Sequence, residues 1–288
     1  MPALAMAGRC HEAARAWRPV APGRAARGGP GARWRRARPR PQGSPQHGPR
    51  PRHAPDHTRG RAVTLPDLGP LWLTLRLGLV VTVLLLALAL PFAWWLAHTR
   101  TRAKPLVEAV TALPLVLPPT VLGFYLLVIF APSAPLGAAF VHLTGETLVF
   151  SFAGLVLASM LYSLPFAVQP LQAAFEALGR APMEAAASLR ARPLDRFFTV
   201  ALPLAGRGVL TAMVLTFAHT LGEFGVVLMV GGNIPGRTRV VSIAIYEHVE
   251  TIRLAEAHGL AALMLGLSFA LLLAVYSVNR RLPRAGGL

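Results

Sequence analysis

The residues best placed to do chemistry are an ionisable pair inside a long apolar stretch, His219 and Glu223. They are four positions apart, so a continuous helix would place both side chains on one face. An ionisable group within a membrane-spanning segment is a functional candidate by default. Two such ligands fall short of the usual zinc set, so we expect no metal. Because a carboxylate repels anions, we expect Glu223 to be structural, paired with His219 or capping backbone amides around Gly222 and Gly225.

Other reactive or nucleotide-binding patterns are missing from the sequence. Cys10 is the single cysteine, which excludes a disulfide framework and a cysteine-based metal site. Lys104 is the single lysine and follows no glycine-rich loop, so the sequence has no Walker A phosphate loop. No nucleophile–base or HExxH signature of an intramembrane enzyme occurs. We therefore predict a chain that is not an enzyme, has no catalytic residues and binds no cofactor; if ATP drives it, another chain hydrolyses the ATP.

Long apolar segments must position the polar residues. Residues 77–97 and 259–279 contain no charged side chain, and each is about long enough to cross the hydrocarbon core of a bilayer. A soluble domain of this size cannot bury five fully apolar helices. The sequence therefore predicts an all-α membrane protein with five spans, at about 71–97, 106–130, 147–170, 208–230 and 259–279.

Hydroxyl and proline residues mark the second and third spans. Ser159 and Ser163 permit close helix packing or can donate hydrogen bonds to an oxyanion. Pro114, Pro118 and Pro119 remove backbone donors and predict a bent or broken second span. Irregular backbone at membrane depth is tolerated where protein or water surrounds it. The proline cluster is thus either a kinked entry to an ordinary helix or part of the lining of a pathway.

A basic segment, residues 171–207, connects the third and fourth spans after the third closes at Pro170. Ala185 and Ala186 favour helix, and Pro193 ends that helix. An apolar run then resumes at Phe197. Two short helices lying across the cytoplasmic mouth of a membrane bundle would have this pattern, and an ordinary amphipathic connector is the alternative.

The distribution of positive charge predicts the orientation in the membrane. The basic loop 98–104, the connector and the C-terminal Arg280, Arg281 and Arg284 are expected on the cytoplasmic side. The loop 131–146 has no lysine or arginine and is expected outside. Five spans with the N-terminus outside and the C-terminus inside satisfy this pattern. The exception is a predicted external loop after the fourth span, which carries three arginines among acidic residues.

Residues 1–62 differ in composition from the rest of the chain. They contain fourteen arginines against two acidic residues and no apolar period, so we assign them no fold. They can be a disordered tail that binds RNA or acidic membranes, or a targeting peptide, although the apolar region of a secretory signal is missing. We favour a third interpretation, a mis-assigned start with Val63 as an alternative initiation site. Residues 63–288 are then the membrane domain.

Several segments resemble permeases of ABC transporters. Glu184-Ala185-Ala186, with Ala191 and Leu202-Pro203 after it, is similar to the EAA loop of that family. Arg190 stands where the family usually has glycine, which suits a turn with positive φ. The strings LPLVLPPTVLG (113–123), LGEFG (221–225) and NIPGRTR (233–239) resemble the molybdate branch and occur in the same order.

The resemblance implies a five-span type I ABC importer permease bundle with a cytoplasmic coupling helix in the bacterial inner membrane. The residues implied for coupling are Glu184, Ala185, Ala186, Leu189, Arg190, Ala191 and Arg192. The implied partners are a second copy of the chain, a cytoplasmic ATPase subunit holding ATP and Mg²⁺, a periplasmic or lipoprotein oxyanion-binding protein and membrane lipid, with no nucleic acid. Molybdate is the implied substrate, and tungstate is not separable from it by sequence.

Two other transport functions remain as alternatives at this stage. A sulfate or thiosulfate permease is the nearer one, although those relatives generally have an additional N-terminal span. An ion-coupled secondary transporter would not need an EAA-like loop and usually shows internal repeats, which this sequence lacks.

Overall fold

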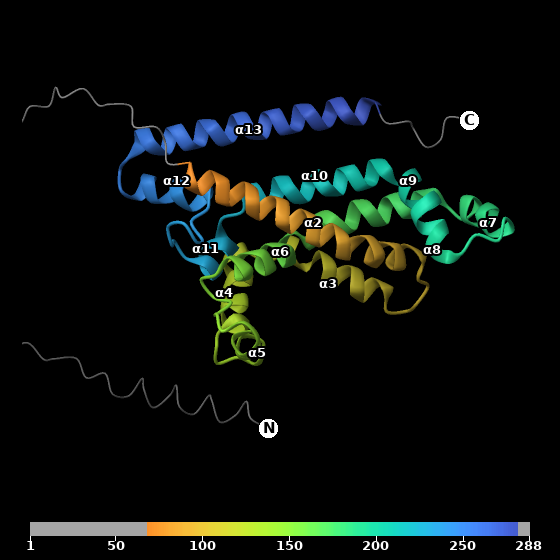
Figure 1. The fold of residues 1–288 in the computed structure, drawn as a ribbon, viewed down its shortest axis with the longest axis horizontal. Helices are drawn as coiled ribbons and strands as arrows, with labels where there is room; N and C mark the ends of the chain where they lie inside the picture. Colours follow the sequence, from red (N-terminus) through yellow and green to blue (C-terminus); the bar gives the residue numbers. More distant parts are fainter. Residues whose placement is uncertain (1–67, 282–288) are drawn as a thin grey trace, which may run out of the picture. The chain divides into compact units, whose positions relative to one another are not determined.

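Every regular element in the described part of the chain is helical. The computed structural model describes residues 68–281, and within this range it contains helices and no strand (Figure 1). This confirms the predicted all-α fold. The interpretations of residues 1–62 and of Arg284 lie outside the described residues.

The elements follow one another along the chain with short connections. They are α2 (Gly69–His98), α3 (Lys104–Val116), α4 (Pro119–Phe130), α5 (Pro135–Thr144), α6 (Phe152–Leu178), α7 (Ala181–Ser188), α8 (Pro193–Arg196), the π-helical turn η1 (Phe197–Ala201), α9 (Leu202–Leu204), α10 (Gly206–Gly222), α11 (Gly225–Gly231), α12 (Val241–Glu250) and α13 (Leu254–Arg281).

Three of the described helices, α2, α6 and α13, are long and apolar enough to cross a membrane. Two further pairs pass the same test together but are bent: α3 and α4 by 110°, and the segment 193–204 with α10 by 75°. Counting each bent pair as one span gives up to five spans, the number expected from the sequence.

The centre of the bundle is the packing of α2 along α6 and α10. Leu85, Leu96 and Leu171 are buried where these helices meet. Gly208 of α10 lies so close to α6 that a Cβ atom there would be 2.2 Å from the Cβ of Ala174. A larger residue at this position would force the two helices apart, which a close-packed interior does not tolerate without strain.

The predicted second span is not one continuous helix. The chain is extended at Leu117 and Pro118, and α4 restarts at Pro119. Proline at the start of a helix costs no hydrogen bond, because the first backbone amides have no intrahelical partner. The proline cluster therefore did predict the break, whereas Pro114 is accommodated inside α3.

The helix of the predicted third span does not end at Pro170, where the sequence was expected to close it. Helix α6 continues through Pro165 and Pro170 as far as Leu178. Proline removes one backbone donor, but packing against neighbouring helices keeps such residues inside membrane helices. Here Phe175, in the turn after Pro170, is fully buried in the same cluster as residues of α2. Tertiary packing thus outweighs the local cost of proline.

A helix, α12, lies within the loop after the predicted fourth span. Its apolar residue Val241 is buried and Ile245 partly buried, while Val249 near its end is exposed. The apolar stripe is therefore covered only at the start of the helix.

A polar network fixes the loop in front of α12. Asn233 donates to the Glu247 carboxylate at 2.8 Å, and the Arg239 guanidinium lies 3.1 Å from the same group. The amide hydrogen bond, assisted by the attraction of Arg239, holds the pKa of Glu247 below its ordinary value. Acidic partners thus neutralise part of the positive charge that made this loop an exception to the expected orientation.

Candidate functional site

The segment from α7 to α9 lies at one end of the bundle, beyond the C-terminal ends of α2 and α6 (Figure 1). Helices α7 and α8 bury no residue of their own. Three large apolar side chains of this end are exposed: Leu189 by 84%, Leu194 by 71% and Phe198 by 60%. Clustered exposed apolar side chains are typical of a surface that another protein covers.

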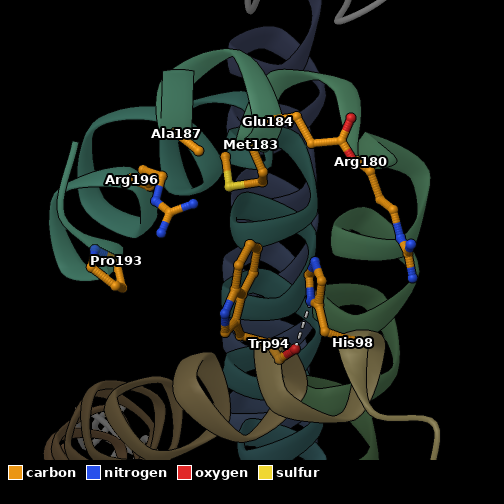
Figure 2. Close-up of a pocket in the computed structure, with 8 residues that line it drawn as sticks. All are labelled: Trp94, His98, Arg180, Met183, Glu184, Ala187, Pro193 and Arg196. Carbon is orange, nitrogen blue, oxygen red and sulfur yellow. Dashed lines mark hydrogen bonds between the residues drawn. The ribbon is translucent and has the colours of Figure 1, made fainter. Parts of the chain in front are cut away.

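A pocket of about 290 Å³ separates α7 and α8 from the end of α2. Figure 2 shows Met183, Glu184 and Ala187 on one side of it and Trp94 and His98 on the other. Arg180, Pro193 and Arg196 complete the lining. This space therefore lies between the short helices and the end of α2.

An aromatic cluster beneath the pocket joins three elements. The Trp94 ring lies 5.1 Å from Phe175 of α6 and 5.3 Å from Phe197 of η1, both edge to face, and 3.9 Å from the His98 ring. The His98 Nδ1 atom is 2.9 Å from the Trp94 carbonyl oxygen. Edge-to-face aromatic contacts are directional. These contacts connect the α7–α9 segment to the ends of α2 and α6.

The structure brings the predicted coupling residues together in one short helix and the turn after it. Glu184, Ala185 and Ala186 lie in α7, Leu189 is its C-cap, Arg190 and Ala191 form the turn, and Arg192 is the extended N-cap of α8. The Glu184 carboxylate sits in the first turn of α7, where the helix dipole favours negative charge.

The turn after α7 has the hydrogen bonds of a Schellman motif. The Arg190 amide donates to the Ala187 carbonyl at 2.9 Å, and the Ala191 amide donates to the Ala186 carbonyl at 3.2 Å. This motif places its C′ residue in the left-handed region, and Arg190 has φ of 59°. An arginine therefore occupies the backbone conformation that glycine adopts without strain.

The intramembrane polar candidates divide into a bonded and an unbonded group. The Ser163 hydroxyl is 2.9 Å from the His219 Nδ1 atom and 3.2 Å from the Thr220 hydroxyl. The His219 ring stacks on Phe166 at 4.0 Å. The buried Ser159 hydroxyl has no hydrogen-bond partner among the described residues. The bonded group ties α6 to α10.

The predicted pairing of Glu223 with His219 is wrong. Helix α10 ends at Gly222, and Glu223 follows it in an extended conformation, so the two residues do not share a helix face. The Glu223 side chain does not cap the neighbouring amides either: among the described residues, neither carboxylate oxygen has a hydrogen-bond partner. The residue is 4% exposed, and the Ser159 hydroxyl lies beside the carboxylate without hydrogen-bond geometry.

Sequence reasoning missed polar residues that contribute to these contacts. Thr220, buried in α10, has its hydroxyl 3.2 Å from that of Ser163. The hydroxyl of Thr216, four residues earlier and also buried, has no hydrogen-bond partner among the described residues. Their spacing, like that of His219 and Glu223, was a usable signal. A second omission is the tie between α3 and α6, in which Lys104 lies 3.0 Å from Glu176. Those two residues are far apart in sequence, so no local pattern indicates their contact.

Comparisons of the sequence with known proteins give a consistent result. The family described as "Binding-protein-dependent transport system inner membrane component" matches residues 89–284. The chain is 58% identical over 214 residues to the molybdenum transport system permease protein ModB of Azotobacter vinelandii, covering 74% of this chain and 95% of that protein. Identity to ModB of Escherichia coli K12 is 38% over 186 residues, covering 63% and 81%. A probable sulfate transport system permease protein of Zygnema circumcarinatum is 32% identical over 204 residues, covering 71% and 69%.

Solved structures share the fold at low sequence identity. The MetNI methionine ABC transporter in inward-facing conformations has a TM-score of 0.58 at 19% identity, covering 75% of this chain and 95% of that chain. A bacterial alginate ABC transporter in complex with its alginate-bound periplasmic protein has a TM-score of 0.62 at 14% identity, covering 77% and 80%. These likenesses identify the fold of an ABC importer permease.

We predict that Arg190→Gly makes the α7 turn more stable by about 1 kcal/mol, because glycine removes the cost of positive φ. Helix α7 buries no residue and can open without the bundle, so the measurement is amide hydrogen exchange of α7 in the purified chain. We expect exchange slower by about fivefold. Arg192→Gly is the matched control: Arg192 has φ of −66°, so no strain is relieved and exchange should not slow. Equal slowing in both variants would contradict the strain at Arg190.

Proposed function

We propose that this chain, which belongs to the family of binding-protein-dependent transport system inner membrane components, is the membrane-spanning permease subunit of an ATP-driven importer for molybdate. The observation that carries the proposal is the 58% identity to a molybdenum transport permease over 95% of that protein's length. The sulfate permease relative is far more distant, at 32% identity. Tungstate, which has the same charge and shape as molybdate, is an expected second substrate.

We infer that a separate ATPase subunit binds at the α7–α9 end. The exposed Leu189, Leu194 and Phe198 offer it apolar side chains, and Glu184 stands exposed on α7. ATP and Mg²⁺ belong to that partner, because the sequence of this chain has no phosphate-binding loop. This end then faces the cytoplasm, which puts the C-terminus inside and the start of α2 outside.

The contacts around Trp94 support a mechanical route through the chain. Closure of the ATPase subunits would push α7, and the edge-to-face contacts of Trp94 with Phe175 and Phe197 would pass that movement to α2 and α6. Helix α2 has 30 residues and is about 45 Å long, so a tilt at one end becomes a displacement at the other. A second copy of the chain would supply the opposite wall of the pathway, and an oxyanion-binding protein would deliver the substrate outside.

The intramembrane polar residues are assigned different roles. Ser163 and His219 hold α6 against α10 through their hydrogen bond. Glu223 lies at the break between α10 and α11, where a negative charge would repel a dianion, so we propose a structural role for it together with Ser159.

Uptake of labelled molybdate tests the proposed function. The chain starting at Val63 is expressed with an ATPase subunit and a binding protein of the family, in a bacterial strain lacking its own molybdate system. We expect uptake that excess tungstate blocks and excess sulfate does not. Block by sulfate would move the chain to the sulfate permeases. Uptake only with residues 1–62 present would contradict our interpretation of those residues as dispensable.

The coupling role of α7 is tested in the same strain by Glu184→Lys. The substitution reverses the charge on the surface proposed to meet the ATPase and opposes the dipole of the helix N-terminus. We expect uptake to be lost while the amount of chain in the membrane fraction is unchanged, measured by immunoblot. Glu256→Lys reverses an exposed charge at the opposite end and is the matched control, for which uptake should persist. Normal uptake in Glu184→Lys would remove α7 from the coupling role.

A further inference from the structure

A second pocket lies at the end of the bundle opposite α7 to α9. It has a volume of about 220 Å³ and is formed by the first turns of α2, the start of α6 with the loop before it, and the loop between α11 and α12. Figure 1 shows that α2 begins near α12, away from α7 and α8. The pocket is lined by Leu73, Arg76, Glu146, Ser151, Phe152, Ala153, Gly236 and Arg237.

Two arginines in this pocket differ from the other arginines at the same end. Arg239 and Arg253 are within 4 Å of the Glu247 carboxylate, whereas neither Arg76 nor Arg237 forms an ion pair within the described residues. The pocket also contains Glu146, which is too far from both guanidinium groups for an ion pair. Two cations thus face one carboxylate, which leaves the pocket with a net positive charge.

The Arg76 side chain is held in place without the use of its hydrogen-bond donors. Its guanidinium carbon lies 4.6 Å from the centre of the Phe152 ring, a cation–π contact. The guanidinium N–H groups of Arg76 have no acceptor among the described residues, so they remain free for a ligand. Arg237 reaches the same pocket from the turn at Gly236, which has φ of 73°.

The other polar groups of the pocket limit the class of ligand that it can bind. The Ser151 hydroxyl donates to the Leu148 carbonyl at 2.8 Å and accepts from the Gly154 amide at 3.1 Å, so it is already occupied. The donors left for a ligand are the two guanidinium groups. Guanidinium groups match the spacing of oxygen atoms in tetrahedral oxyanions. The small volume excludes a large organic anion.

We propose that Arg76 and Arg237 form a binding site for a tetrahedral oxyanion at the entrance end of the chain. Two sources can supply this chemistry: free molybdate arriving from outside, or the phosphate of an anionic lipid headgroup beside the start of α2. The inference rests on the proposed function at one point only: the proposed function puts this end of the chain on the outer side of the membrane. The site itself is defined by the two unpaired arginines.

The test uses the full chain in complex with its ATPase subunit, without the binding protein and without ATP. The complex is placed in nanodiscs of phosphatidylcholine alone or with phosphatidylglycerol added. Bound radiolabelled molybdate is measured by equilibrium dialysis, and phosphatidylglycerol carried through detergent extraction is measured by mass spectrometry. The variants are Arg237→Gln and Arg76→Gln/Arg237→Gln. Arg253→Gln, which removes the same charge from outside the pocket, is the matched control.

We expect Arg237→Gln to weaken binding about tenfold, the double variant to abolish it, and the control to bind as the unchanged chain does. Molybdate bound in phosphatidylcholine alone would identify the free oxyanion as the ligand. Retained phosphatidylglycerol that disappears in the double variant, without molybdate binding, would identify the lipid headgroup. Neither ligand binding, or both binding equally in all variants, would overturn the site.

Two features of the test keep a loss of binding distinct from misfolding and from a loss of transport. Arg237 is exposed in a loop, and the helical circular dichroism and size-exclusion profile of each variant show whether it is folded. The binding assay requires no transport. A chain that carries molybdate but shows no arginine-dependent binding would refute only this site, whereas binding by a chain that fails to transport molybdate would refute only the proposed function.

Discussion

Close packing of the broken helices α4 and α11 against each other and against α6 holds the bundle together. A Cβ atom at Gly225 of α11 would lie 2.8 Å from Pro119 of α4, and one at Gly231 would lie 2.4 Å from Leu155 of α6. In a bilayer, irregular backbone survives only where protein or water surrounds it. The glycines let α4 and α11 pack so closely that two interrupted spans form one unit with the continuous helix α6.

This arrangement separates the chain into two ends with different surfaces. At one end α7 and α8 expose apolar residues and stand over the Trp94 cluster; at the other, α12 and its loop carry paired and unpaired charges. Helices α2 and α6 run between the ends. The coupling that we propose would use these two well-packed helices as its connection between the ends. The charged end is in turn suited to meeting an anion.

Much of this could be predicted from the sequence, because the determining patterns are local. Apolar length indicated the spans, and the proline cluster indicated the break before α4. The sequence left open which geometry the turn takes at Arg190, and the structure shows that this arginine adopts positive φ. The failures arise where distant packing decides. Pro170 remains inside α6 because the next turn is buried against other helices. Glu223 leaves the helix at the glycine-flanked break, so its four-residue spacing from His219 no longer places the two side chains together.

The pairings across the bundle were likewise beyond the sequence. Ser163 meets His219, and Lys104 meets Glu176, only because α6 lies beside α10 and α3. In each contact a polar residue pairs with a partner far away in the sequence. Many other positions could have supplied that partner. Buried polar groups are costly when unpaired, which favours such contacts. The fold nevertheless decides which groups find a partner, and among the described residues it leaves Ser159 and Glu223 without one.

ATP-driven transport can be measured with purified components. The chain and its ATPase subunit are reconstituted in proteoliposomes, with the binding protein and labelled molybdate on the side of the start of α2. Our account predicts accumulation that requires ATP on the α7 side and ceases when the binding protein is omitted. Accumulation driven by a proton or sodium gradient, with no dependence on ATP, would contradict it and make the chain a secondary transporter.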